Sequence, residues 1–346
     1  MADPVKAEPA PRGRRVALQR LLRWDTTLVL LLVVVAVAGQ QTSPGFLSGR
    51  NLFYLGLDIG EIALLSLPLT LIIVAGEIDL SVASVLGLSS ALIGYLWDAG
   101  LPLETILPAV VAAGAAAGAL NGFLVTRLGL PSLAVTIGTL ALYRGLAFVV
   151  LGDRAVADFP ASYTKYGTTP LPGTHVPYPM ALFAVLALIF AVVLHGTPFG
   201  RSVFAIGANS EAAFFSGIRV RRTKHLLYVI SGAVAGLAGV DYTLRFASAR
   251  ADNGTGLELA VVAAVLLGGV SIFGGRGTLG GVVAAVFLLG GVRNALILND
   301  VSNDTLNVVT GLLLIGSVVA PSAVSAAARV LRPRRAAPQQ KPAGAA

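Results

Sequence analysis

The sequence predicts an all-α membrane protein, a polytopic bundle of about ten transmembrane helices in two inverted repeats of five. Three observations predict this class: an apolar composition, a succession of apolar stretches and a similarity between the two halves. Hydrophobic residues make up 55% of the 346-residue chain and charged residues only 12%. Soluble domains carry roughly 25% charged residues. The chain has too few charges to solvate a globular surface, whereas lipid accommodates an apolar exterior.

A membrane span needs about 20 mostly apolar residues. The N-terminal span follows a basic segment, and its residues Ala36, Val37 and Ala38 resemble a signal-peptide cleavage site. We interpret it as a retained helix, with cleavage as the alternative. We expect spans at residues 26–39, 53–75, 80–97, 103–125, 133–151, 179–194, 226–245, 257–273, 279–298 and 306–320.

The 25 Lys and Arg residues predict the orientation of these spans. With the N-terminus inside, most basic residues fall on the cytoplasmic side, as the positive-inside rule requires. Both termini are then cytoplasmic. We divide the chain into a basic tail (1–25), a transmembrane domain (26–325) with an internal loop at 197–225 and an external loop at 152–178, and a disordered tail (326–346). The basic residues expected outside are Arg50, Arg154, Lys165, Arg245 and Arg250.

An internal similarity favours two repeats. Asp79 opens the third expected span and Glu258 the eighth, while Asn121 and Asn294 lie near the ends of the fourth and ninth. Units of five spans have opposite orientations in the membrane, an arrangement common in transporters. Chance resemblance between apolar helices is the alternative. The two acids fit either a helix cap, stabilised by the helix dipole, or a solute pathway.

Polar residues within the expected spans indicate an interior that is not fully apolar. Arg144 is costly in hydrocarbon, so it either faces the bundle interior or extends to the interface. The candidate translocation pathway comprises Asp79, Asn121, Thr136, Thr139, Arg144, Glu258 and Asn294.

Glycines spaced by four, at Gly114, Gly118 and Gly122 and again at Gly232 and Gly236, predict close helix packing in lipid.

No motif for catalysis or cofactor binding is present. The chain has no cysteine, and its three histidines lack metal-ligand spacing. The glycines around Arg276 lack the lysine and hydroxyl of a phosphate-binding loop. We therefore expect no catalytic residue, no metal and no cofactor on this chain. The net charge of +8 is a topology signal, and we expect no nucleic-acid partner.

Several blocks resemble a known family in the same order along the chain. Residues 76–81, GEIDLS, resemble the GGIDLS signature of sugar-type ABC importer permeases, the ribose permease group. The blocks TIGTLALYRG (136–145), FGRSVFAIGANSEAAFFSGI (199–218), ASARADNGTGLEL (247–259) and AAVLLGGVSIFGGRGTLGG (263–281) extend the resemblance over roughly residues 51–320. The run LPLTLIIVAGEIDLS (67–81) together with the block 247–259 looks closest to permeases for rhamnose and autoinducer-2.

The resemblance implies a permease in the bacterial inner membrane, embedded in lipid and paired with an identical or homologous second permease. It further implies cytoplasmic ATPase subunits that bind ATP and Mg²⁺, an extracytoplasmic solute-binding protein, and a rhamnose-, pentose- or autoinducer-2-like solute. The segment 199–218 resembles the coupling loop to the ATPase. The coupling residues that this implies are Gly200, Arg201, Gly207, Asn209, Glu211, Ala212, Gly217 and Ile218.

The chain departs from the family pattern at a few positions. Glu77 replaces the usual second glycine of the signature. In the coupling segment, glycine, proline and arginine are common at the positions of Ala208, Ser210 and Phe214. Individual contacts with an ATPase are therefore uncertain even where the loop is recognisable. The rival interpretation is an ion-coupled secondary transporter, for which Asp58, Glu61 and Asp241 supply acids within the spans.

Overall fold

The computed structural model describes residues 24–302 and scattered positions between 305 and 319. The basic tail before residue 24, the tail 326–346 and most of the last expected span, 306–320, lie outside the described residues. In the described part the regular elements are helices. Two isolated β-bridges pair residues of the connecting segments. They are α2 (Trp24–Thr42), α3 (Gly49–Val74), α4 (Val82–Asp98), α5 (Leu103–Thr126), α6 (Ser132–Leu151), α7 (Ala161–Thr168), α8 (Tyr178–Gly196), α9 (Pro198–Ala208), α10 (Ser210–Phe215), α11 (Val220–Phe246), α12 (Leu257–Leu267) and α13 (Leu279–Ile297).

Seven of these helices are long and apolar enough to cross a membrane: α2, α3, α5, α6, α8, α11 and α13. Two shorter apolar helices, α4 and α12, lie among them. The span expected at 257–273 ends early, because α12 stops at Leu267. Gly268 and Gly269 follow it, and Gly269 adopts a positive φ of 83° that terminates the helix.

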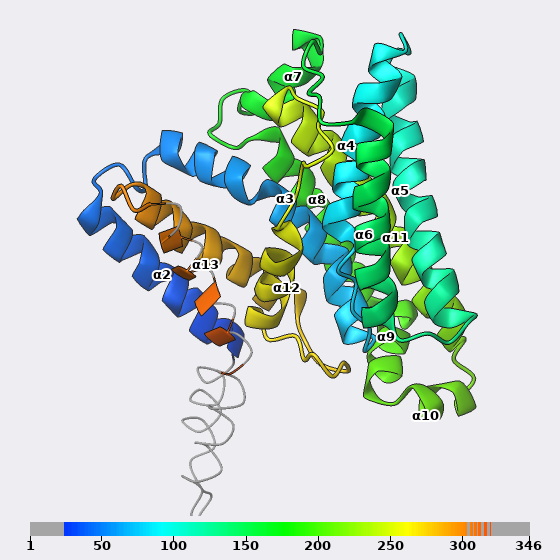
Figure 1. Ribbon diagram of the computed structural model, residues 1–346. Helices are drawn as coiled ribbons and strands as arrows, with labels where there is room; N and C mark the ends of the chain where they lie inside the picture. The colour runs from blue at the N-terminus through cyan, green and yellow to red at the C-terminus, as the bar shows by residue number, and fades with distance from the viewer. Residues whose placement is uncertain are drawn as a thin grey trace, which may run out of the picture.

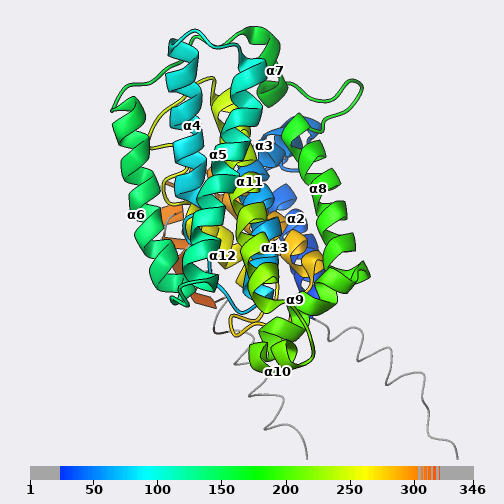
Figure 2. The same cartoon turned by 90° about the vertical axis from the view of Figure 1, so that its right-hand side faces the viewer.

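Helices α3 and α11 form the centre of the bundle (Figures 1 and 2). Helix α11 packs against α3, α4 and α5, while α3 packs against α11, α12 and α13. Helix α6 covers α4, and α2 covers α13. The Trp24 indole anchors α2 by donating a hydrogen bond to the Leu267 carbonyl at 2.7 Å. Figure 1 places α9 and α10 at one end of the bundle and α7 at the other.

The seam between α5 and α11 is built from glycines. A Cβ at Gly118 would lie 2.1 Å from the carbonyl oxygen of Tyr228, and one at Gly232 would lie 2.1 Å from that of Gly114. Only hydrogen fits in these contacts, so the backbones approach as closely as small residues allow. The close helix packing predicted from the glycine spacing is confirmed.

Two connections inside the bundle are not helical. Residues 75–81 join α3 to α4, and residues 247–256 join α11 to α12. Asp79 is 2% exposed and Asn253 8% exposed, so each connection has a buried polar residue, whereas Arg250 and Asp252 of the second connection are exposed. Irregular backbone at membrane depth is tolerated only where protein or a water-filled cavity satisfies its polar groups. Both connections therefore need dedicated hydrogen-bond partners.

Candidate functional site

Asp79 is the centre of the first buried polar cluster. One carboxylate oxygen accepts hydrogen bonds from the Ser81 backbone N–H at 3.0 Å and the Ser81 hydroxyl at 2.7 Å. The other accepts a hydrogen bond from the Ser231 hydroxyl at 3.1 Å. Asp79 thus fixes the turn that leads into α4 through the N-cap residue Ser81, and it also ties that turn to α11.

Further polar groups extend this cluster towards α5 and α6. The Asn121 side-chain amide donates to the Ser81 hydroxyl at 2.8 Å. The Tyr143 hydroxyl donates to the Ala117 carbonyl at 2.8 Å and lies 3.3 Å from the Asn121 side-chain oxygen. Polar side chains from α5, α6 and α11 therefore converge on the turn before α4.

The two threonines of the candidate pathway lie next to this turn. The Thr136 hydroxyl donates to the Ile78 carbonyl at 3.4 Å, and that of Thr139 donates to the Thr136 carbonyl at 3.5 Å. Both side chains are buried. The structure therefore brings Asp79, Asn121, Thr136 and Thr139 together.

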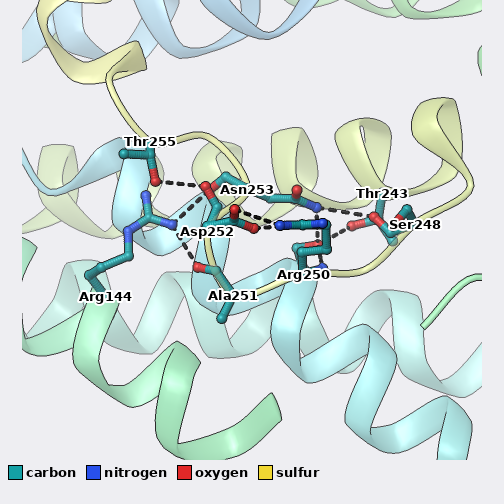
Figure 3. A network of polar contacts seen from close by, with 9 residues as sticks. Arg144, Thr243, Ser248, Arg250, Ala251, Asp252, Asn253 and Thr255 are labelled. Carbon is teal, nitrogen blue, oxygen red and sulfur yellow. Dashed lines mark hydrogen bonds and ion pairs between the residues drawn. The ribbon is translucent and has the colours of Figure 1, made fainter. Parts of the chain in front are cut away.

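Arg144 holds the second irregular connection (Figure 3). One guanidinium nitrogen donates to the carbonyls of Ala251 and Asn253 at 2.7 and 2.8 Å. The other donates to the Ala83 carbonyl in the first turn of α4 at 3.3 Å. The side chain points into the bundle, so the alternative of extension to the interface is wrong. The Arg144 guanidinium group therefore donates hydrogen bonds to carbonyls of both the connection 247–256 and α4.

The same connection is held from the other side by side-chain hydrogen bonds. The Asn253 amide donates to the Ser90 hydroxyl at 2.8 Å and to the Ser248 carbonyl at 3.1 Å. The Thr243 hydroxyl lies 2.7 Å from the same Ser90 oxygen. Figure 3 shows these residues along the loop, with the exposed Arg250–Asp252 ion pair beside them. The residues 247–256 are therefore fastened to α4 and α6, and Thr243 of α11 contacts the same Ser90 hydroxyl.

The remaining candidate pathway residues lie apart from one another. Glu258 is half-buried in the first turn of α12. Asn294 exchanges two amide hydrogen bonds with Asn51, at 2.7 and 3.2 Å, and so joins α13 to α3. The structure does not bring Asn294 to the cluster around Asp79.

The segment that resembles a coupling loop forms two short helices with defined caps. The Thr197 hydroxyl accepts a hydrogen bond from the Gly200 N–H at the start of α9. The Asn209 side-chain oxygen accepts from the N–H groups of Glu211 and Ala212 at 3.0 and 2.9 Å, which starts α10. Arg201 is exposed in α9, and Ile218 follows the end of α10.

The end of α10 exposes aromatic side chains to solvent. Gly217 has a φ of 84°, which ends the helix and favours glycine. Phe214 is 64% exposed and Phe215 79% exposed. An exposed aromatic pair of this kind is typical of an interaction surface.

A glycine junction joins α9 to the turn before α4. A Cβ at Gly207 would lie 1.8 Å from the Val74 carbonyl oxygen, and the Gly275 N–H donates to that same oxygen at 2.8 Å. A Cβ at Gly274 would lie 2.9 Å from the Gly76 Cα. Four glycines from three distant segments, Gly76, Gly207 and the pair Gly274 and Gly275, thus meet in one contact. Sequence analysis placed Gly207 in the coupling segment but gave no sign of its partners.

Glu77, the departure from the family signature, has a partner in this region. Its carboxylate forms an ion pair with the Lys224 ammonium, and both side chains are largely buried. The extra charge beside Asp79 is therefore neutralised by α11.

The acids of the rival interpretation surround Arg245 in the contact between α3 and α11. One Arg245 nitrogen lies 3.0 Å from both oxygens of Glu61, and the other lies 2.7 Å from an Asp58 oxygen. One buried oxygen of Asp241 has no hydrogen-bond partner among the described residues. Among the residues that the structure describes, no group of acids and histidines has the arrangement of a metal site.

The opposite end of the bundle carries the connection that includes α7. An antiparallel bridge between Val156 and Ala249 links it to the second irregular connection. The Tyr163 hydroxyl donates to the Glu104 carboxylate, and this hydrogen bond raises the pKa of Tyr163.

Comparisons with known proteins decide the class. A protein-family model described as "Branched-chain amino acid transport system / permease component" matches residues 51–318. The autoinducer 2 import system permease protein LsrD of Photorhabdus temperata is 33% identical over 305 residues, which cover 86% of this chain and 91% of that protein. LsrD of Yersinia enterocolitica serotype O:8 is 34% identical over 305 residues, with 86% and 92% covered. No solved structure matches the chain significantly.

The chain belongs to this permease family. It is a membrane transport subunit and not an enzyme, as the sequence predicted. Family membership and the seven apolar helices make it a multi-pass protein of the inner membrane.

Proposed function

We propose that this permease is the membrane subunit of an ATP-binding cassette importer for a sugar-like solute of the autoinducer-2 class. Cytoplasmic ATPase subunits bind ATP and Mg²⁺, a second permease completes the pore, and an extracytoplasmic protein delivers the solute. One observation carries the proposal: Gly207 joins the α9–α10 segment to the turn that holds Asp79. A movement of α9 by a docked ATPase therefore reaches a buried polar cluster directly.

The solute class rests on the relatives and on the chemistry of the interior. Both relatives named above are autoinducer 2 import permeases, whereas the family description names branched-chain amino acids. Around Asp79 the buried groups are hydroxyls and amides, from Ser81, Asn121, Tyr143 and Ser231. Such groups exchange hydrogen bonds with a polyhydroxylated solute as it passes.

Uptake in proteoliposomes containing the assembled transporter tests the solute class. We expect the cognate binding protein to bind autoinducer-2 or a related sugar, and ATP to drive its accumulation. Tight binding of leucine, with no binding of autoinducer-2, rhamnose or pentoses, would replace this proposal with amino-acid import. Titration of the same binding protein with each solute distinguishes import of a sugar-like solute from import of an amino acid.

The proposed topology has about ten spans in two inverted repeats, with both termini cytoplasmic. The helix contacts support the repeats. In one half α4 and α5 pack on α11, and in the other half α12 and α13 pack on α3. The two central helices, α3 and α11, pack on each other. Each central helix is followed by an irregular connection and a short helix. The end of the bundle that bears α9 and α10 also carries basic residues: Arg127, Arg276, Arg201 of α9 and the basic start of α11. This charge supports a cytoplasmic position for that end.

Substitution of Gly207 tests the coupling path. Because a Cβ would lie 1.8 Å from the Val74 carbonyl oxygen, Gly207→Ala must displace α9 from the turn before α4. We expect solute import per ATP hydrolysed to fall about tenfold or more, the cost of a clash of 1–3 kcal/mol at this joint. Glu211→Lys and Gly217→Leu should also uncouple hydrolysis from import, because they alter the proposed ATPase contact.

The matched control is Gly196→Ala, since a Cβ there meets only a Val192 methyl carbon at 3.8 Å. It should import normally. Size-exclusion chromatography of each assembled complex separates uncoupling from failed assembly. Normal coupling in an assembled Gly207→Ala transporter, together with normal import by the α10 variants, contradicts the coupling assignment.

The ion-coupled alternative makes an opposite prediction. Arg245 pairs with Asp58 and Glu61, which leaves one buried oxygen of Asp241 without a hydrogen-bond partner in the described structure. We expect import to require ATP and to continue in the presence of a protonophore. Import that persists without the ATPase and collapses with the protonophore would establish the alternative.

A further inference from the structure

A basic hollow lies where α5 ends and α11 begins. Its volume is about 440 Å³. The lining combines an aromatic ring, a hydroxyl, three arginines and a histidine. These residues are Phe123, Thr126, Arg127, Arg221, Arg222 and His225.

The hollow follows from the glycine seam. At Gly122 the two helices still touch, since a Cβ there would lie 3.1 Å from the His225 carbonyl oxygen. Phe123 follows Gly122 directly, and one turn further α5 carries Thr126 in place of glycine. Larger side chains force the backbones apart, and the space between them opens at the end of the bundle.

The hollow concentrates positive charge without neutralising it. Arg127 comes from the end of α5, while Arg221 and Arg222 come from the first turn of α11. Within the residues that the structure describes, none of these three guanidinium groups forms a side-chain hydrogen bond or ion pair, and no acid lines the hollow. Clustered, unpaired cations of this kind attract an anion with several acceptor oxygens.

The surroundings of the hollow are those of a lipid headgroup site. It lies at the ends of two candidate spans, which is the level of the membrane boundary. Of the residues that line the hollow, Phe123 is apolar and 47% exposed. One helical turn away on the same two helices lie Leu120, before Phe123, and Leu226, after Arg222, which are 41% and 45% exposed. A phosphate alone uses only the arginines, whereas a phospholipid also covers these exposed apolar groups. Basic pockets between membrane helices bind anionic headgroups in this way.

We propose that Arg127, Arg221 and Arg222 bind the headgroup phosphate of an anionic phospholipid, whose acyl chains lie along Leu120, Phe123 and Leu226. The bound lipid fills the gap between the end of α5, beyond Gly122, and the start of α11. It thereby supports the α5–α11 seam at the end of the bundle that carries α9 and α10. This site does not depend on the identity of the transported solute.

Native mass spectrometry of the purified permease tests the site, with phosphatidylglycerol and phosphatidylcholine of the same acyl chains as probes. We expect wild type to retain phosphatidylglycerol at least about tenfold more tightly than phosphatidylcholine. Arg127→Gln with Arg222→Gln should weaken phosphatidylglycerol binding about tenfold. The matched control, Arg201→Gln with Arg276→Gln, removes the same charge from exposed positions outside the hollow and should change binding less than about threefold.

Three results would overturn the proposal. Equal losses in the two double variants would show that the hollow is not the site. Equal retention of the two lipids would show that the permease does not recognise the headgroup. Displacement of phosphatidylglycerol by inorganic phosphate at comparable concentration would show that the arginines bind free phosphate. If the double variant does not purify folded, Arg222→Gln alone, with an expected loss of about threefold, gives the same comparison against Arg201→Gln.

Discussion

Replacing Gly118 by alanine should destabilise the permease by about 1–3 kcal/mol, the usual cost of overpacking. The added Cβ would lie 2.1 Å from the Tyr228 carbonyl oxygen and 2.9 Å from its carbonyl carbon. Both obstacles are backbone atoms of α11, which no rotamer change removes. The two helices must separate along the seam, and Gly232, which meets Gly114 and Gly118, loses its close contacts with them. Thermal unfolding in detergent, followed by fluorescence, measures the loss.

The matched control is Gly145→Ala on α6, where a Cβ meets no atom within 4 Å. Alanine there removes the helix penalty of glycine, so stability should rise by about 0.5–1 kcal/mol. The pair of variants makes the same chemical change in two helices. Equal stability of the two variants would contradict the glycine seam as the feature that holds α5 to α11.

Replacing Arg144 by methionine should destabilise the fold by about 3 kcal/mol or more and abolish import. The substitution leaves the buried carbonyls of Ala251 and Asn253 without their charged donor, and each such hydrogen bond contributes about 1.5–3 kcal/mol. The connection 247–256 then loses its hold on α6. Thermal unfolding and proteoliposome import, measured on the same preparation, give the two effects.

Arg250→Gln is the control for Arg144. Arg250 belongs to the same connection, but it pairs with Asp252 at an exposed position, where solvent screens the attraction. We therefore expect Arg250→Gln to unfold at the same temperature as wild type. If Arg144→Met were as stable as Arg250→Gln, the arginine would not support the connection.

The sequence predicted the spans well because hydropathy acts locally. Each apolar stretch between residues 26 and 298 contains a helix, and the glycines of α5 and α11 form the close contact that their spacing indicated. The early end of α12 is also local, since Gly268 and Gly269 follow it directly. Composition and spacing describe interactions between neighbours in sequence or with lipid, and these interactions decide span positions.

The candidate site was predictable only in part. Asp79 and Asn121 were singled out by the similarity between the two halves, and Thr136 as a polar residue within an expected span. Their partners Ser81, Ser231 and Tyr143 carry no such signal, because serine and tyrosine are common at membrane helix contacts and interfaces. Asn294 passed the same test as Asn121 but pairs with Asn51 instead. Cost in lipid identifies a polar residue, and only its neighbours in space show what it binds.

The sequence by itself determined that the chain is a helical membrane protein of a permease family. Spans, charge bias and ordered motif blocks all depend on residues read in order. Only the tertiary structure decided that Arg144 points inward to the connection 247–256 and that Gly207, Val74 and Gly275 meet at one junction. These contacts join segments from opposite halves of the chain. The physical reason is that buried backbone groups must be paired, and their partners are chosen by packing and not by sequence order.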